Sequence, residues 1–290
     1  MSFLSRIYTF CIKETLCNFT KLNRFIEIIK SHESLYGCAY TANCHFCIRV
    51  VDKASILIIG LIMLKRVSVL RGNDIISKPY DEHQQFFVEH SSVKRITKGE
   101  VIVEEGANIL FVVFPIDSAV SIQIHPPGDA SVEVLPVGRT SIIGGHIAIG
   151  ARRSRFLAKT IVSGDSVWVP AADFMRLVND NEHVRNVVLE SVRNEFSIIA
   201  SLKGCSTRNS AAYRIGCWLG ILSDLCGRTH LDITQRDIAD CFGIRLATAS
   251  DSCRALKDDG YIDYTRGDIQ VNKAVAPRRS CACRDFYSLN

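Results

Sequence analysis

The residues whose types and spacing point most clearly to a chemistry lie between Thr234 and Gln270. Thr234 is followed three residues later by Asp237, so its hydroxyl can cap free amides while the carboxylate lies at the positive end of a helix. Gly243 can then take the positive φ angle of a tight turn without a Cβ penalty. Two short helices joined by such a turn are a unit that many proteins insert into the major groove of DNA.

The second of these helices offers the side chains that would hydrogen-bond to DNA. Arg245, Thr248 and Ser250 are the candidate readers of base edges, and Asp251 can accept from a cytosine amino group or exclude wrong sequences. Arg266 is expected at the tip of a hairpin, where it would bind a phosphate without reading sequence. A winged domain that contacts only proteins is the alternative. The predicted DNA-binding residues are Thr234, Gln235, Arg236, Arg245, Leu246, Ala247, Thr248, Ser250, Asp251 and Arg266.

The elements that must position these side chains can be outlined from the apolar pattern. An amphipathic helix is predicted over 211–227, a strand-like segment over 230–233 and a hairpin over 261–271. This is the order of elements in a winged helix-turn-helix domain. The expected inner faces are Ile238, Ala239 and Phe242 on the first short helix, and Ile244, Ala249, Cys253 and Leu256 on the second.

The middle of the chain has the pattern of an antiparallel β-roll or sandwich. A helix is predicted over 81–90 and two short strands within 93–107. Apolar runs bounded by turn residues follow over 109–114, 119–125, 131–137, 156–163 and 166–170. Strands of this length and spacing favour a compact antiparallel domain.

A long helix is predicted after a short one over 171–180, with Gly204 as its interruption. A helix of that length with an apolar stripe needs a partner surface. We expect the same helix of a second subunit to supply it, and packing onto its own domain is the alternative. The stripe consists of Val184, Val188, Val192 and Phe196, with Val187, Ile199 and Leu202 close to the same face.

From about Gln85 to the C-terminus the chain resembles regulators of the Crp/Fnr type. The resemblance is strongest in TQRDIADCFGIRLATASDSCRALKDDGYIDYTRGDIQV, with its first helix, glycine turn, reading helix and arginine-glycine wing tip. It implies an α+β fold with a β-roll of the cyclic-nucleotide-binding type, a long dimerisation helix and a C-terminal winged helix-turn-helix. It also implies a homodimer on a two-fold-symmetric operator in double-stranded DNA, with RNA polymerase as a further candidate partner.

This resemblance suggests a division of the chain into five parts. Residues 1–80 are an N-terminal extension without an assigned fold, and translation from Met63 is one hypothesis for it. The β-roll is expected over 81–180, the dimerisation helix over 181–204, the winged domain over 205–275 and a tail over 276–290.

The chain departs from the family pattern at two places. Many members carry an Arg-Glu pair and a later Arg on the reading helix, where this chain has Leu246, Ala247 and Asp251. Bidentate arginine-to-guanine readout is therefore lost at those positions, and we expect a different operator.

The second departure is in the effector loop, whose candidate residues are Gly144, Gly145, Arg153 and Ser154. In members that bind cyclic nucleotide, a glutamate that binds the ribose stands where this chain has Gly145. The missing carboxylate argues against cyclic nucleotide binding and leaves the effector unknown. An anionic ligand held by Arg153 and a solvated or structural arginine are both open.

Composition narrows the remaining function classes. The chain of 290 residues is 47% hydrophobic and 22% charged, a composition typical of a folded globular protein. Its net charge of +5 is consistent with a polyanionic partner. No apolar run approaches the length of a membrane span, and we expect a cytoplasmic protein. No nucleophile with a base stands out and no Walker loop is present, so we expect no enzyme activity and no cofactor.

The rival function is a ligand-binding module that signals by protein contact.

The 12 cysteines do not form the pattern of a secreted disulfide framework. Cys217 and Cys241 lie at apolar helix positions and are expected in the core. Cys38, Cys44 and Cys47 cluster near the N-terminus, but the roll supplies no fourth thiolate for an iron–sulfur cluster. Together with the pair Cys281 and Cys283, they lead to no metal prediction.

Overall fold

The computed structural model describes residues 69–77, 86–126, 128, 130–272 and 283. All of them belong to one compact unit, Gly60–Asn290. Most of the extension over 1–80, the cluster of Cys38, Cys44 and Cys47, and Cys281 lie outside the described residues. Within the described part of the chain, no helix combines the length and apolarity needed to cross a membrane.

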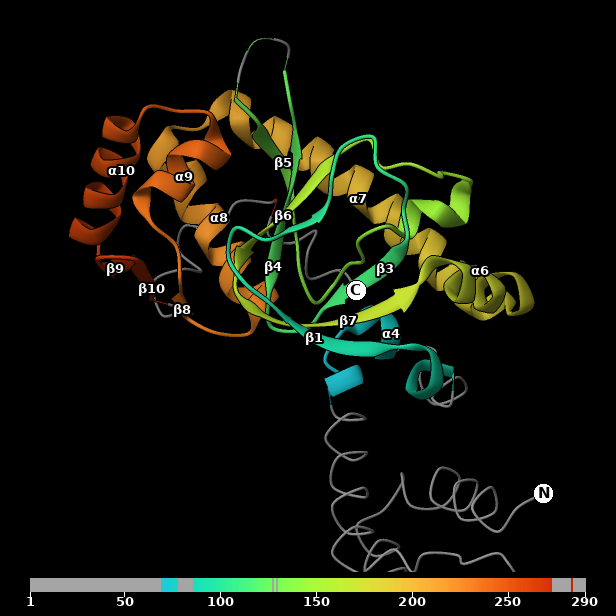
Figure 1. Cartoon of the computed structure of the whole chain (residues 1–290). Helices are drawn as coiled ribbons and strands as arrows, with labels where there is room; N and C mark the ends of the chain where they lie inside the picture. Colours follow the sequence, from blue (N-terminus) through green and yellow to red (C-terminus); the bar gives the residue numbers. More distant parts are fainter. Residues whose placement is uncertain (1–68, 78–85, 127, 129, 273–282, 284–290) are drawn as a thin grey trace, which may run out of the picture. The chain divides into compact units, whose positions relative to one another are not determined.

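Two antiparallel sheets form the expected β-roll (Figure 1). One sheet has the order β1-β7-β3 and the other β2-β6-β4-β5, and apolar side chains from both sheets are buried, as alternation in the sequence predicts. The strands are β1 (Ser92–Ile96), β2 (Val101–Val103), β3 (Phe111–Pro115), β4 (Ala119–Ile124), β5 (Val132–Val137), β6 (Leu157–Val162) and β7 (Gly164–Pro170).

Short helices cover one end of the roll. They are α4 (Asp74–Ser77), the 3₁₀ helix η2 (Gly145–Ile149) and α6 (Ala171–Asp180). The helix expected over 81–90 is present over its described part, 86–90. Phe87, Phe114 and Phe174 meet edge to face in the core beneath them, an arrangement that aromatic rings prefer when buried.

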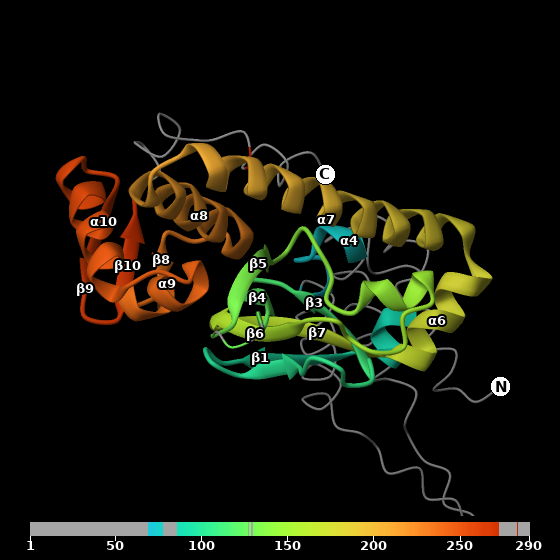
Figure 2. The same ribbon diagram turned by 90° about the horizontal axis from the view of Figure 1, so that it is seen from above.

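Helix α7 (Glu182–Arg208) runs along the roll towards the winged domain, as Figure 2 shows from above. Asn181 begins it by accepting a hydrogen bond from the Val184 amide at 2.9 Å. The helix continues through Gly204 and ends at Asn209, so the interruption predicted at Gly204 is wrong. A single glycine in a helix interior costs only about 1 kcal/mol relative to alanine, which the rest of the helix can tolerate.

The apolar stripe predicted along α7 divides between two faces. Val184, Val187 and Val188 are buried against the core of the roll, so the N-terminal half packs onto its own domain. Phe196 lies on another face and is 76% exposed. Residues spaced by three and four drift slowly around a helix, which is why one linear pattern covers both faces.

The winged domain has the element order predicted from the sequence. Its core is built on α8, whose Trp218, Leu219 and Leu222 pack against the later helices, and the buried Tyr261 hydroxyl donates to the Gly216 carbonyl at 2.8 Å. Its sheet has the order β8-β10-β9. The elements are α8 (Ala211–Cys226), β8 (His230–Leu231), α9 (Gln235–Phe242), α10 (Leu246–Asp258), β9 (Ile262–Thr265) and β10 (Asp268–Val271).

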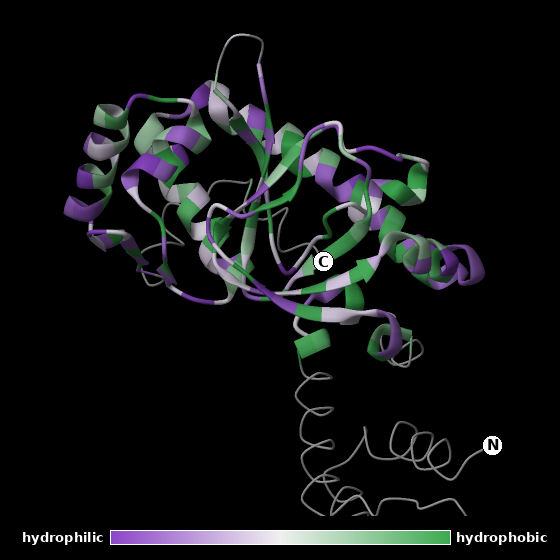
Figure 3. Cartoon of the chain, in the orientation of Figure 1, coloured by the Kyte–Doolittle hydropathy of each residue, from purple (hydrophilic) through white to green (hydrophobic). Residues whose placement is uncertain are grey.

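Hydropathy differs between the roll and the last helix. Figure 3 shows hydrophobic residues concentrated in the roll strands, whereas α10 alternates hydrophilic and hydrophobic turns. Cys217 and Cys241 are buried, which confirms them as core residues, and Cys283 is buried beside Ser201. No group of three or more potential ligand residues that could hold a metal occurs among the residues described.

Candidate nucleic-acid interface

The first helix of the helix-turn-helix begins where the sequence predicts. The Asp237 amide donates to the Thr234 hydroxyl at 3.1 Å, and the Thr234 amide donates to the Asp237 carboxylate at 2.7 Å. Burial acts to raise the pKa of Asp237, but hydrogen bonds from Lys98 and Thr234 outweigh it and hold that pKa below its usual value. The carboxylate therefore stays charged at the positive end of α9.

Gly243 makes the turn between the two helices. Its φ angle is 60°, and the Ile244 amide donates back to the Ala239 carbonyl at 3.0 Å. Ile244 is half-buried and precedes the second helix, which begins at Leu246. Ala249, Cys253 and Leu256 are buried in the winged domain, as predicted. The inner face of α10 is therefore locked to its domain.

The outer face of α10 is exposed. Arg245, Leu246, Ala247, Thr248 and Asp251 are all exposed in the structure. The Arg245 side chain forms no hydrogen bond or ion pair with the described residues, whereas Asp251 faces Arg254 at 3.8 Å. This face is free to enter a groove, which is the condition on which the DNA-reading prediction depends.

Ser250 differs from the other predicted readers. It is half-buried, and its hydroxyl donates to the Gln235 side-chain oxygen at 2.7 Å. This bond ties the start of α9 to α10 and leaves the amide nitrogen of Gln235 to face solvent or a ligand. Arg236, the next residue of α9, is exposed. Gln235 and Arg236 are thus placed beside the reading face by a contact that spacing alone does not reveal.

The wing tip has the predicted form. Arg266 is exposed between β9 and β10, and Gly267 takes a φ angle of 88°. The strands pair in register from Asp268 with Thr265 to Val271 with Ile262. Arg266 has no partner in the described part of the chain, so its charge is available to an anion. Arginine at such a position suits contact with the DNA backbone.

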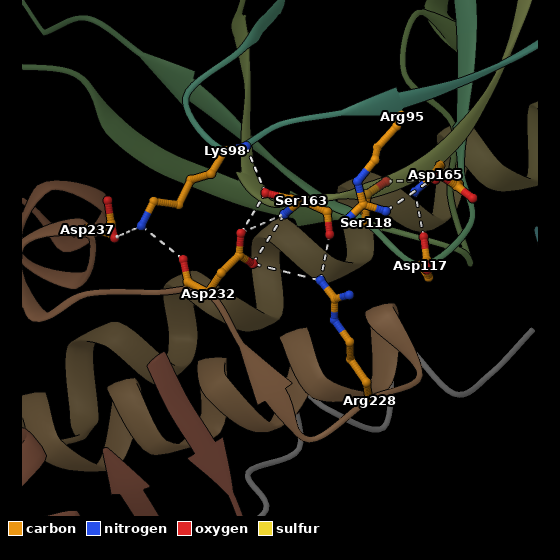
Figure 4. A network of polar contacts seen from close by, with 9 residues as sticks. All are labelled: Arg95, Lys98, Asp117, Ser118, Ser163, Asp165, Arg228, Asp232 and Asp237. Atoms are coloured by element: carbon orange, nitrogen blue, oxygen red, sulfur yellow. Dashed lines mark hydrogen bonds and ion pairs between the residues drawn. The ribbon is translucent and has the colours of Figure 1, made fainter. Parts of the chain in front are cut away.

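A polar network joins the roll to the winged domain, and sequence reasoning missed it (Figure 4). The Lys98 ammonium donates to the Asp237 carboxylate at 2.8 Å and to the Asp232 carbonyl at 2.9 Å. The Ser163 hydroxyl donates to the Asp232 carboxylate at 2.5 Å, and Arg228 donates to the Ser163 carbonyl at 2.5 Å. Lys98 thus reaches the capping acid of α9 from the roll. No local pattern pairs residues so far apart in sequence.

Three of the four predicted effector residues lie around a cavity of about 680 Å³ between the roll and α7. Gly144, Arg153 and Ser154 line it, and most of the wall is apolar. The Ser154 hydroxyl donates to the Phe156 carbonyl at 2.6 Å, which satisfies it within its own turn. Arg153 is exposed and has no partner among the described residues.

Gly145 is not part of the cavity wall. It is buried, and a Cβ atom there would lie 2.4 Å from the Ile142 Cδ1 atom, so a glutamate does not fit without a shift of the core. Glu195 and His146 line the cavity instead, 3.3 Å apart. Burial raises the pKa of Glu195 to about 8 and lowers the pKa of His146. Both side chains are therefore largely uncharged at neutral pH.

Comparison with known proteins agrees with this geometry. A model of the Crp-like helix-turn-helix domain matches residues 214–275. The fold is similar to that of FixK2 from Bradyrhizobium japonicum, with a TM-score of 0.55 and 16% identity over 66% of this chain and 98% of that one. Comparison with curated proteins gives no match.

Two further structures share the fold. TTHB099, a CRP-family transcriptional regulator from Thermus thermophilus, has a TM-score of 0.53 and 14% identity, over 64% of this chain and 96% of that one. The c-di-GMP-responsive global regulator CLP from Xanthomonas campestris has a TM-score of 0.53 and 14% identity, over 66% and 98%. Residues 214–275 therefore form a Crp-like helix-turn-helix domain, and the chain as a whole shares the roll-and-helix fold of these solved structures.

Proposed function

We propose that this protein is a DNA-binding transcription regulator of the Crp/Fnr type, and that it acts as a homodimer that reads a two-fold-symmetric operator with α10 and holds the DNA backbone with the wing. The observation that carries the proposal is the geometry of α10. Its inner residues Ala249, Cys253 and Leu256 are fully buried, whereas the side chains of its first turn are exposed. A helix fixed on one side and open on the other can present side chains to base edges reproducibly.

The proposed division of work follows from side-chain chemistry. Arg245 and Thr248 are the polar groups of the first turn that can hydrogen-bond to base edges. Leu246, 39% exposed, offers an apolar contact suited to a thymine methyl group. Arg266 is separated from this helix by the wing and would contact phosphate. Positioning and reading therefore reside in different elements.

Changing Arg266 to Ala is expected to weaken binding about equally for all sequences and to reduce its salt dependence, because a phosphate contact releases counterions. Changing Arg245 to Ala or Thr248 to Val is expected to alter sequence preference, by about 1–3 kcal/mol per lost base contact. Selection and sequencing of bound genomic DNA, followed by titrations at several salt concentrations, measures both effects. Arg176→Ala on the distant α6 serves as the control for loss of an exposed arginine.

The same selection yields the spacing of the half-sites. Two half-sites about one helical turn apart, or a multiple of that, support a two-fold-symmetric dimer. Equal effects of the Arg245 and Arg266 changes on sequence preference would overturn the division of work. Recovery of no preferred sequence would favour the rival function, in which the winged domain contacts proteins such as RNA polymerase.

We also propose that the roll does not bind cyclic nucleotide. The support is that Gly145 supplies no carboxylate to bind a ribose, and that any side chain there would have to displace the Ile142 side chain. Addition of cAMP or cGMP is expected to leave the thermal midpoint of unfolding unchanged, because only a ligand that binds the folded state raises it. A concentration-dependent rise that Arg153→Ala abolishes would contradict this proposal and would make Arg153 a phosphate ligand.

A further inference from the structure

A buried carboxyl group lies between the roll and the helix-turn-helix. Glu133 is a residue of β5, and its Oε1 atom accepts a hydrogen bond from the indole nitrogen of Trp218 on α8 at 2.6 Å. The residue as a whole is half-buried, but its Oε2 atom is inaccessible to solvent. Next to it, the Val132 side chain packs against the turn at Gly243, leaving no space for a Cβ atom there. The β4–β5 hairpin thus contacts both helices that support α10.

The surroundings of this carboxyl disfavour its charge. Oε2 has no partner in hydrogen-bond geometry among the described residues. The Ser121 hydroxyl and the Cys241 thiol lie close enough to lower the pKa of Glu133 in part, as does Trp218, but burial outweighs all three and raises it to about 7. None of these groups, from β4, α8 and α9, carries a charge, since burial keeps the pKa of Cys241 well above its ordinary value.

We propose that Glu133 is a positioning residue for DNA reading: its uncharged carboxyl docks α8 and α9 on the β4–β5 hairpin and so sets the orientation of α10 relative to the roll. This inference rests on DNA reading by α10.

A short chain of contacts connects Glu133 to the reading helix. Trp218, which donates to the carboxyl, meets the Phe242 ring edge to face with centroids 5.5 Å apart. Phe242 is the last residue of α9 and precedes Gly243, where the chain turns into α10. A displacement of Trp218 would therefore reach the start of the reading helix through two side chains.

Among the polar contacts between the roll and the winged domain, the ion pair of the roll with α9 is more exposed than the Glu133 contact. Lys98 and Asp237 form a partly exposed ion pair, with 31% and 27% of their side chains accessible, and such pairs contribute little net stability. If the contact between Glu133 and Trp218 is broken without exposure to water, a buried polar group is left without a hydrogen-bond partner, which costs free energy.

The pH dependence has a definite sign. When docked, the Glu133 carboxyl has a pKa of about 7, and its ordinary value is 4.5. Between pH 4.5 and pH 7 the Glu133 carboxyl is therefore protonated when docked and ionised when undocked. The equilibrium constant for docking is thus largest below pH 4.5 and falls by about tenfold per pH unit up to about pH 7. Because the outer face of α10 is exposed in the docked arrangement, docking favours DNA binding.

The first test is a titration of the free protein by NMR. The indole N–H signal of Trp218 is expected to shift with a midpoint near pH 7, and Glu133→Gln should abolish this shift while keeping an acceptor for the indole. Trp168 is an internal control, because its indole donates to the Ser166 hydroxyl at 2.9 Å and should not titrate. A Trp218 signal that is insensitive to pH in the unmodified protein would overturn the proposal.

The second test measures affinity for a selected operator between pH 6 and 8. As the pH rises from 6 to 8, the affinity of the unmodified protein for the operator is expected to fall by about threefold to tenfold. The affinity of Glu133→Gln should change little over the same range. The affinity of the surface variant Glu104→Gln should fall as much as that of the unmodified protein. Parallel pH curves for the unmodified protein and Glu133→Gln would overturn the positioning role. Failure to bind any DNA would instead contradict the proposed function, while the NMR titration would still decide whether the contact exists.

Discussion

Replacing Phe196 by Asp is expected to convert the regulator to a monomer and to weaken operator binding by about 100-fold or more, because two linked half-site contacts become one. Phe196 is 76% exposed on α7. Leu189, Val192 and Ile199 lie within two helical turns of it and are only partly buried. Val192, Phe196 and Ile199 line one wall of the roll cavity, and the exposed Phe196 ring is the apolar side chain of α7 that a second copy of the same helix would cover.

Sedimentation analysis and operator titration measure the two effects. A charge placed at an exposed position should leave the fold intact, which circular dichroism can verify. Asn186→Asp adds the same charge at another exposed residue of α7 and should change neither mass nor affinity. A dimer that persists in Phe196→Asp would show that α7 is not the main subunit contact.

Replacing Gly243 by Ala is expected to lower the free energy of unfolding by about 2–4 kcal/mol. A positive φ angle costs a residue with a side chain about 1–2 kcal/mol, and the φ angle here is 60°. The added Cβ atom would also lie 2.8 Å from the Val132 Cγ1 atom on β5, and overpacking of that kind costs about 1–3 kcal/mol. Both penalties arise at the turn on which the orientation of α10 depends.

Two comparisons separate these penalties in denaturant unfolding. Gly267 also has a positive φ angle, 88°, but a Cβ atom there meets nothing within 4 Å. Gly267→Ala should therefore cost only the backbone strain. Adding Val132→Ala to Gly243→Ala should recover part of the loss, as a coupling between neighbouring residues. Equal losses for Gly243→Ala and Gly267→Ala would contradict the contact between the turn and the roll.

Two glycines show where the structure differs from the sequence-based expectations. Gly204 has the chemistry of a helix end, yet α7 continues to Arg208 because a long helix tolerates one glycine. Gly145, which the sequence predicts among the effector residues, is buried beside Ile142 and does not itself line the cavity, whereas its neighbours Gly144 and His146 do.

Local chemistry was sufficient for much of the molecule. The capping pair Thr234 and Asp237, the glycine turn at Gly243 and the alternating apolar strands act over a few residues, so the order of the elements and the exposed face of α10 could be predicted from local patterns. Only the fold makes the Oε2 atom of Glu133 inaccessible to solvent, since alternation along a strand does not say what will cover it. The tertiary structure also decided that Lys98 meets Asp237. Burial depends on which distant elements meet, and a carboxyl on a strand carries no local mark of the indole that will face it.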